Sequence, residues 1–269
     1  MPAGAQGRIL TLALLGLAGS LSAATRYVEE PQAEACRQWE ITEQAVWDGS
    51  IDRKDARKRF QELWPNLSIT ELAPPPEGLW QWVFPLPGYG PDDFSGQSYD
   101  PDDFKFYDGP KALGHPAVNI YARDPRRKAL DERNDKPIVV VSATSGVVVS
   151  ARKFWGEGES NPLGIYVCVL SQHEKRFFYY AQLSRLKVGL GQVIDKGQVL
   201  GWLGRSGHDL VRKNLGTHLR FEVHSWDDGL FYPVYPGRAL KAAERLPWPL
   251  PEPDYNKPPK KRRGHGPKK

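Results

Sequence analysis

Residues 217 to 224, Thr-His-Leu-Arg-Phe-Glu-Val-His, bring together side chains that are capable of chemistry. In a β-strand, alternate side chains point to opposite faces, so His218, Arg220, Glu222 and His224 would share one face. Leu, Phe and Val would form the other face, which is apolar. Histidine serves as a metal ligand and as an acid–base group near neutral pH. This strand is therefore the candidate centre of a functional site.

Three segments precede this strand in order: Gly114-His-Pro-Ala-Val-Asn119, Tyr179-Tyr-Ala-Gln-Leu183 and Gly191-Gln-Val-Ile-Asp-Lys-Gly-Gln-Val-Leu-Gly201. Together the four segments resemble the lysostaphin/LytM-type peptidoglycan endopeptidases. The resemblance spans residues 115 to 223. It implies a mainly β fold, an antiparallel sandwich or barrel-like domain known as the duplicated hybrid motif.

The resemblance also assigns roles to single residues. In active members of that family, zinc is held by a His and an Asp of an H-x-x-x-D motif and by the second His of an H-x-H motif. By this resemblance His115 is a metal ligand and His218 is a catalytic residue. Asn119 and Arg220 stand at the other two metal positions, and Gln182 replaces a second catalytic His.

These three replacements disfavour zinc. An Asn amide oxygen is a poor zinc ligand, Arg has no lone pair to donate, and Gln cannot take a proton. An Arg about 4 Å from a divalent ion, at an effective dielectric of about 20, would cost on the order of 8 kcal/mol in repulsion. Structural zinc sites gain roughly 10–16 kcal/mol in peptides. We therefore expect no bound cofactor, with zinc only if the activity of the family is retained.

Other histidines offer little replacement for the missing ligands. His224 shares the face of His218, but it is six residues further along the strand, and even four residues of strand span about 13 Å, too far for one ion. His208 lies in a loop that could fold over the site, and His173 is a further candidate. For all three, a surface or hydrogen-bonded imidazole is the favoured interpretation.

The altered pocket also has a positive interpretation. Arg220 offers a planar fork for a carboxylate, and His115 and Asn119 add hydrogen-bonding groups beside it. We take these three as substrate-binding residues. The hypothesis is that the cleft binds an anionic stem peptide without hydrolysing it.

The surrounding sequence indicates a β domain over residues 115–243. It is rich in Val, Ile, Tyr and Phe, with Gly and Asn at the joints. The expected strands are 118–122, 138–142, 146–151, 164–170, 177–182, 192–194, 199–203 and 217–224. A charged loop over 123–136 should be exposed, with Asp124, Asp131, Glu132 and Asp135 facing solvent.

Two segments precede this domain. Residues 25–72 have apolar residues every three to four positions, which predicts a pair of helices broken at Gly49-Ser50, with Ser50 or Asp52 capping the second. Residues 73–114 are rich in Pro, Gly and Asp and should form a turn-rich strap. Its two Pro-Asp-Asp-Phe repeats lack the ligand spacing of a calcium loop.

The two ends of the chain indicate its location. Residues 1–24 have a basic residue, a short apolar run and small residues before Ala24, which is typical of a secretory signal peptide. The Pro-rich residues 244–269 should be a disordered tail. Removing the seven cations of residues 257–269 from the net charge of +5 leaves −2, so the basic character belongs to the tail. Cys36 and Cys168 could pair, but Cys168 lies in an apolar run typical of a buried thiol.

These patterns predict a protein that crosses the inner membrane into the periplasm. Its expected partners are peptidoglycan or its stem peptides and a wall hydrolase, with the tail contacting anionic polymers or a membrane surface. No specific nucleic-acid partner is expected. We predict a pseudoenzyme that binds peptidoglycan or regulates a hydrolase. Two alternatives stay open: an active zinc endopeptidase with a replacement ligand, and a structural envelope module.

Overall fold

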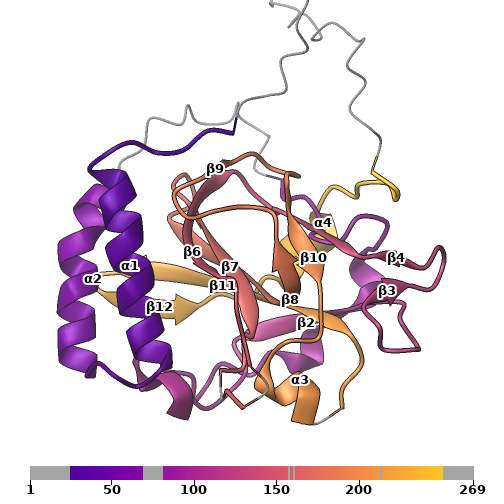
Figure 1. Cartoon of the computed structure of the whole chain (residues 1–269), viewed down its shortest axis with the longest axis horizontal. Helices are drawn as coiled ribbons and strands as arrows, with labels where there is room; N and C mark the ends of the chain where they lie inside the picture. The colour runs from indigo at the N-terminus through magenta and orange to yellow at the C-terminus, as the bar shows by residue number, and fades with distance from the viewer. Residues whose placement is uncertain (1–24, 69–80, 157, 160, 213, 251–269) are drawn as a thin grey trace, which may run out of the picture. The chain divides into compact units, whose positions relative to one another are not determined.

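Antiparallel strands build most of the protein (Figure 1). The computed structural model describes residues 25–68, 81–156, 158–159, 161–212 and 214–250. The predicted signal peptide, residues 69–80 and most of the predicted tail lie outside this part of the chain. Within it, no helix has the length and apolar character needed to cross a bilayer.

The main sheet has ten strands, and its central path runs β1-β2-β11-β8-β7-β6-β9. All pairings between these strands are antiparallel. The path is open at both ends, so the sheet does not close into a barrel. The strands are β1 (Phe94–Ser95), β2 (Ala117–Tyr121), β5 (Val139–Val141), β6 (Gly146–Arg152), β7 (Ile165–Ser171), β8 (Arg176–Leu186), β9 (Val193–Ile194), β10 (Val199–Leu203), β11 (His218–Asp227) and β12 (Leu230–Pro233). The mainly β, antiparallel fold predicted from the sequence is confirmed.

Short elements complete the chain. A separate two-stranded ribbon joins β3 (Leu130–Asp131) to β4 (Lys136–Pro137). The remaining elements are three 3₁₀ turns, η1 (Pro91–Asp93), η2 (Gly96–Ser98) and η3 (Phe106–Lys111), and two short helices, α3 (His208–Arg212) and α4 (Gly237–Ala242).

The main sheet has two buried faces. Leu219, Phe221 and Val223 of β11 lie in one apolar cluster. Tyr179 and Phe177 of β8 belong to the cluster on the opposite face. The face of β11 that carries His218 and Arg220 is therefore opposite the Leu219 cluster, as the strand alternation predicted.

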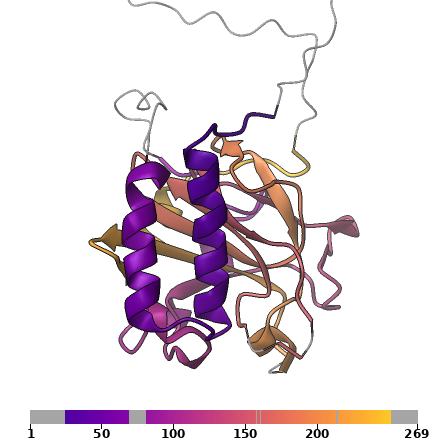
Figure 2. The same ribbon diagram turned by 60° about the vertical axis from the view of Figure 1, so that its left-hand side comes forward.

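Two helices cover part of the sheet: α1 (Gln32–Trp47) and α2 (Arg53–Leu67) (Figure 2). Asp52 caps α2 by accepting hydrogen bonds from the N–H groups of Lys54 and Asp55. Trp39 of α1 is fully buried and stacks on Phe177 with ring centroids 5.1 Å apart. The helices thus contribute their apolar faces to the second cluster, as expected for a pair that packs on the β domain.

A carboxylic acid is buried under α1. Glu43 accepts hydrogen bonds from the hydroxyls of Tyr166, at 2.7 Å, and Tyr179, at 2.5 Å. Burial disfavours its charged form and raises its pKa to about 7, although these hydroxyls oppose the shift. Sequence analysis assigned no chemistry to this helix.

Because the pKa of Glu43 is higher in the folded state than its ordinary value of 4.5, the native state holds this proton more tightly. Glu43 therefore contributes stability below pH 4.5 that is lost as the pH rises through 7. Between pH 4.5 and 7 the free energy of unfolding of the native chain should therefore fall relative to that of the Glu43→Gln variant, by on the order of 3 kcal/mol in total. Urea unfolding at pH 4.5 and 7.5 measures the difference. If the free energy of unfolding changed with pH in the same way in the two proteins, this expectation would be wrong.

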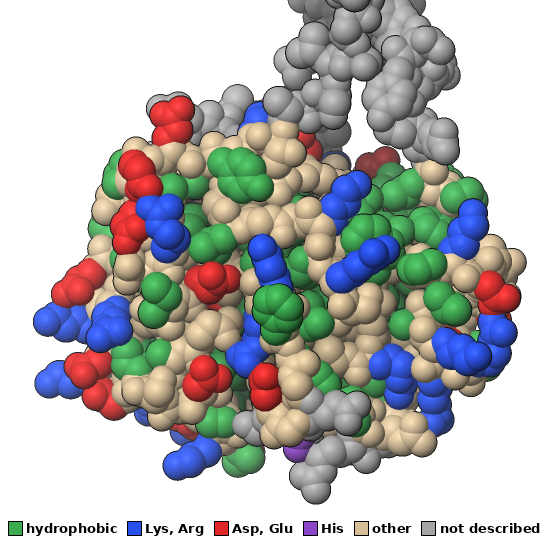
Figure 3. Space-filling view, in the orientation of Figure 1, with side chains coloured by type: hydrophobic (Ala, Val, Ile, Leu, Met, Phe, Trp, Pro, Cys, Tyr) green, Lys and Arg blue, Asp and Glu red, His purple; other side chains and the backbone are tan. Residues whose placement is uncertain are grey.

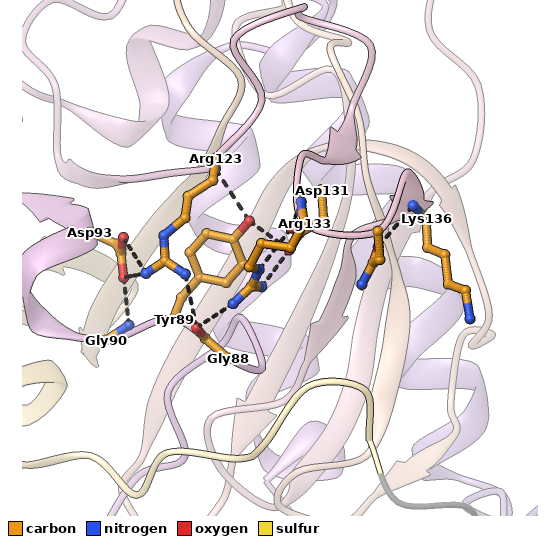
Figure 4. Close-up of polar contacts among 9 residues, drawn as sticks. Gly88, Tyr89, Gly90, Asp93, Arg123, Asp131, Arg133 and Lys136 are labelled. Atoms are coloured by element: carbon orange, nitrogen blue, oxygen red, sulfur yellow. Dashed lines mark hydrogen bonds and ion pairs between the residues drawn. The ribbon is translucent and has the colours of Figure 1, made fainter.

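The charged loop over 123–136 is held against the domain (Figure 4). Arg123 and Arg133 lie 4.8 and 5.1 Å from the centre of the Tyr89 ring. Asp131 is 1 % exposed and accepts hydrogen bonds from Arg133 and from the Tyr89 hydroxyl. The expectation that Asp124 and Asp131 face solvent was wrong, because both carboxylates accept internal hydrogen bonds that offset their burial.

The predicted boundaries of the strap and tail also need correction. Phe84, Leu86 and Tyr89 of the strap lie in the core of the β domain. The backbone N–H of Glu244 donates to Trp82, and that of Gly88 donates to Leu246. The chain over 244–246 is therefore part of the fold rather than the start of a disordered tail. Cys36 and Cys168 are both buried free thiols.

Candidate functional site

Two neighbouring strands bring the sequence-predicted residues together. In the antiparallel register of β2 and β11, Asn119 is directly opposite Arg220. His115 precedes β2 and is held by backbone hydrogen bonds in both directions with Asp100. On its other side β11 pairs with β8, where Arg220 is opposite Ala181, the residue before Gln182. The fold thus places all five predicted positions on or beside three adjacent strands.

His115 and His218 have the same hydrogen-bonding pattern. Nδ1 of His115 is 3.0 Å from the Ala117 carbonyl, and Nδ1 of His218 is 2.7 Å from the Gly216 carbonyl. A carbonyl can only accept, so each Nδ1 carries the proton and each Nε2 keeps its lone pair. Each imidazole is therefore oriented as a single nitrogen ligand or acceptor.

Both imidazoles are neutral at physiological pH. Burial lowers the pKa of His115 to about 4, and the charge of Arg220 adds to the shift. Burial likewise lowers the pKa of His218 to about 4, although its bond to Gly216 opposes the change. The charges of Arg220 and Arg205 further disfavour protonation of His218.

Arg220 is part of a buried ion pair. Its side chain is 6 % exposed, and its Nε donates to Glu222 Oε1 at 2.5 Å. The other carboxylate oxygen is 2.9 Å from Nε2 of His224. Burial alone would raise the pKa of Glu222, but the Arg220 charge and the His224 contact reverse the effect and lower it to about 2.

Glu222 is the residue that sequence analysis left without a role. Its position two residues from Arg220, on the same strand face and with opposite charge, is the signal that could have identified it. The guanidinium of Arg220, which was predicted to bind the carboxylate of a ligand, therefore already binds a carboxylate of the same chain. Its Nε edge is occupied by Glu222.

Gln182 and Asn119 each have a buried oxygen without a partner. Gln182 is 2 % exposed and Asn119 is 7 % exposed. Within the described part of the chain, neither Gln182 Oε1 nor Asn119 Oδ1 accepts a hydrogen bond. Gln182 also has a left-handed backbone, with φ of 66°, which is costly for a residue other than Gly. Unsatisfied buried acceptors are uncommon in native proteins and point to a missing donor.

The donor set does not fit zinc. Two neutral imidazoles are available, but Arg220 and Asn119 stand where the resemblance expects an imidazole and a carboxylate. Among the described residues, no three His, Cys, Asp or Glu side chains cluster as metal ligands. Tetrahedral zinc sites need three protein ligands or more, so we derive no metal-dependent step for this site.

The remaining histidines do not complete the set. His224 is bound to Glu222 and packs against Phe104 and Tyr179. His173 lies in the turn between β7 and β8, near the Ser225 end of β11 and away from His218. His208 begins α3, and its backbone N–H donates to Asn161.

Comparison with protein families found one match, over part of the chain. Residues 127–231 match Peptidase family M23, a range that includes Gln182, His218 and Arg220 but not His115 or Asn119. The search of curated proteins found no match.

Three of the solved structures to which the chain is similar carry the name of a peptidase. The catalytic domain of lysostaphin from Staphylococcus simulans is 19 % identical, with a TM-score of 0.37, over 56 % of this chain and 95 % of that one. A putative glycyl-glycine endopeptidase LytM from Ruminococcus gnavus is 17 % identical, with a TM-score of 0.41, over 82 % of this chain and 90 % of the other. A zinc-containing peptidase from Vibrio cholerae is 19 % identical, with a TM-score of 0.38, over 62 % of this chain and 41 % of its own.

The match of residues 127–231 to Peptidase family M23 confirms the resemblance of this part of the β domain to lysostaphin/LytM-type endopeptidases.

Proposed function

We propose that this chain is a non-hydrolytic M23-type protein of the cell envelope, which binds the stem peptides of peptidoglycan. The observation that carries the proposal is Arg220, a buried cation with its own counter-ion at a position where the family has a zinc ligand. The guanidinium replaces the charge of a metal but cannot activate water. Binding therefore persists in this pocket without hydrolysis.

Hydrogen-bonding groups around Arg220 support peptide binding. Asn119 and Gln182 offer unpaired amide oxygens, and the two imidazoles offer Nε2 acceptors. Backbone N–H groups of an extended peptide are the complementary donors. Regulation of a wall hydrolase and a periplasmic location extend this proposal. Both rest on the signal peptide predicted from residues 1–24 and on the peptidoglycan chemistry of the family that the chain resembles.

Incubation of the purified protein with isolated peptidoglycan sacculi tests the proposal. We expect the protein to sediment with sacculi and to release no soluble muropeptides, with or without added zinc. A chain truncated after residue 250 should still sediment, which separates the pocket from the basic tail. Zinc-dependent release of muropeptides would instead establish an active enzyme. Loss of sedimentation in both forms would favour a structural module.

A further inference from the structure

A cavity of about 450 Å³ lies at the end of β11 that is remote from His218. Its walls come from α2, from the turn between β7 and β8, and from the turn between β11 and β12. Trp226 lines it and lies eight residues beyond His218, which corresponds to about 26 Å of strand. The cavity is therefore separate from the polar face around His218, and its volume lies within the range of small-molecule sites, about 300–1,000 Å³.

Two indoles form the main apolar part of the lining. Trp64 of α2 and Trp226 of β11 have ring centroids 5.3 Å apart and planes inclined by 31°. Rings at this distance are in direct contact, so no flat ligand fits between them. Trp226 also contacts Trp39 at 5.4 Å, and Trp64 contacts Phe177 at 6.1 Å. Both indoles are half-buried, so the parts that remain exposed form one rigid apolar surface.

The turn between β11 and β12 is fixed against α2. Gln61 of α2 donates to Oδ1 of Asp228 at 2.9 Å and to the backbone carbonyl of that residue at 3.2 Å. Arg57 donates to the same carbonyl at 2.9 Å. Gly229 has φ of 79°, and a Cβ there would lie 2.8 Å from Cγ of Gln61. The polar wall of the cavity is therefore arranged before a ligand binds.

The charges around the cavity are balanced. Lys175 and Asp227 line it with opposite charges, and Asp228 is paired with Arg57 at 3.3 Å. On the face of the molecule seen in Figure 3, Lys and Arg side chains are intermixed with Asp and Glu over the two helices. A charged ligand would therefore gain little here from electrostatic attraction.

We propose that this cavity binds a neutral saccharide. One side of a sugar ring carries C–H groups, which pack on the exposed indole surface of Trp64 and Trp226. Its rim carries hydroxyls, which exchange hydrogen bonds with the amides of Gln61 and Gln172 and donate to the carboxylate of Asp227. Apolar surface with a few placed polar groups is the usual composition of a small-molecule site. The site goes beyond the proposed peptide binding and does not depend on it.

Calorimetric titration of the full chain tests the site with two neutral probes, N-acetylated chitotetraose and cellotetraose, and one anionic probe, tetragalacturonate. We expect at least one neutral probe to bind with a Kd of about 1 mM or lower, and more tightly than the anionic probe. Trp64→Ala should weaken this binding at least about ten-fold, because it removes one of the two indoles. Asp227→Ala, which changes an exposed side chain, should weaken it by about three-fold or more through the lost hydrogen bond.

Trp202→Ala is the matched control, since it removes another half-buried indole, which contacts Arg185 outside the cavity. It should leave saccharide binding unchanged, and urea unfolding checks that each variant is folded. Binding of neither neutral probe, tighter binding of the anionic probe, or equal losses in Trp64→Ala and Trp202→Ala would overturn the site. If Trp64→Ala does not fold, Asp227→Ala decides, because unchanged binding in that variant would equally overturn the site. If sacculi are bound but neither neutral probe is, the saccharide site alone fails. If a neutral probe is bound but sacculi are not, the proposed function alone fails.

Discussion

Glu222→Gln is expected to destabilise the folded domain by about 3–5 kcal/mol, as measured by urea unfolding at pH 7. The side chain of Glu222 is 2 % exposed, and its two oxygens bind Arg220 and His224. Replacing the carboxylate with a neutral amide leaves the buried guanidinium without a counter-ion. An uncompensated buried charge is among the few changes that cost this much.

A double variant separates the ion pair from the packing around it. Arg220→Met combined with Glu222→Gln removes both charges, so it should be more stable than Glu222→Gln alone. Glu132→Gln, which removes an exposed carboxylate of the charged loop, should change stability by less than about 0.5 kcal/mol. A cost below about 1 kcal/mol for Glu222→Gln would show that Arg220 does not depend on this partner.

The second large effect is a gain of zinc binding by back-substitution. The combination Asn119→Asp, Arg220→His and Gln182→His restores the residue types that the family resemblance expects around His115 and His218. Because Asn119 and Arg220 are opposite each other in the β2–β11 register, the new carboxylate and imidazole would face the same space. We expect zinc affinity at least about a thousand-fold above that of the native chain, since three ligands suffice for a protein zinc site.

Calorimetric titration at pH 7.5 measures this gain. Arg238→His provides the control, because it adds a histidine on the exposed surface of α4 and should bind no tight zinc. Arg220→His alone should gain less than the combination, since it still lacks the carboxylate ligand. No gain in the combined variant would mean that these positions do not converge on one ion.

The sequence predicted the strands and the polar face of β11 because alternation and apolar runs are local properties. Strand β11 extends from His218 to Asp227, slightly beyond the predicted 217–224, and Asp52 is the cap of α2. Local patterns also placed Arg220 opposite the apolar face. They could not show which group would neutralise it in a buried site, because that depends on rotamers as well as on strand direction.

Contacts between distant segments account for what the sequence did not predict. From the sequence Asp131 is expected at the surface, but the hydroxyl of Tyr89, far upstream, donates a hydrogen bond to its carboxylate. The helical pattern around Glu43 gives no sign that this residue is buried, but the hydroxyls of Tyr166 and Tyr179 of the sheet donate hydrogen bonds to its carboxyl group. Arg205 donates a hydrogen bond to the Thr217 hydroxyl, which in turn donates to Asp124. Each polar group is paired by a residue more than ten positions away, which no local pattern encodes.

The metal content of the native protein distinguishes a metal-free binding protein from a zinc peptidase. The full chain is equilibrated with one equivalent of zinc at pH 7.5, desalted, and analysed by mass spectrometry of the retained metal. We predict far less than one zinc per chain, because the resemblance to the family puts Arg220 and Asn119 at two of its metal positions. Stoichiometric zinc that is lost on His115→Ala would contradict the account.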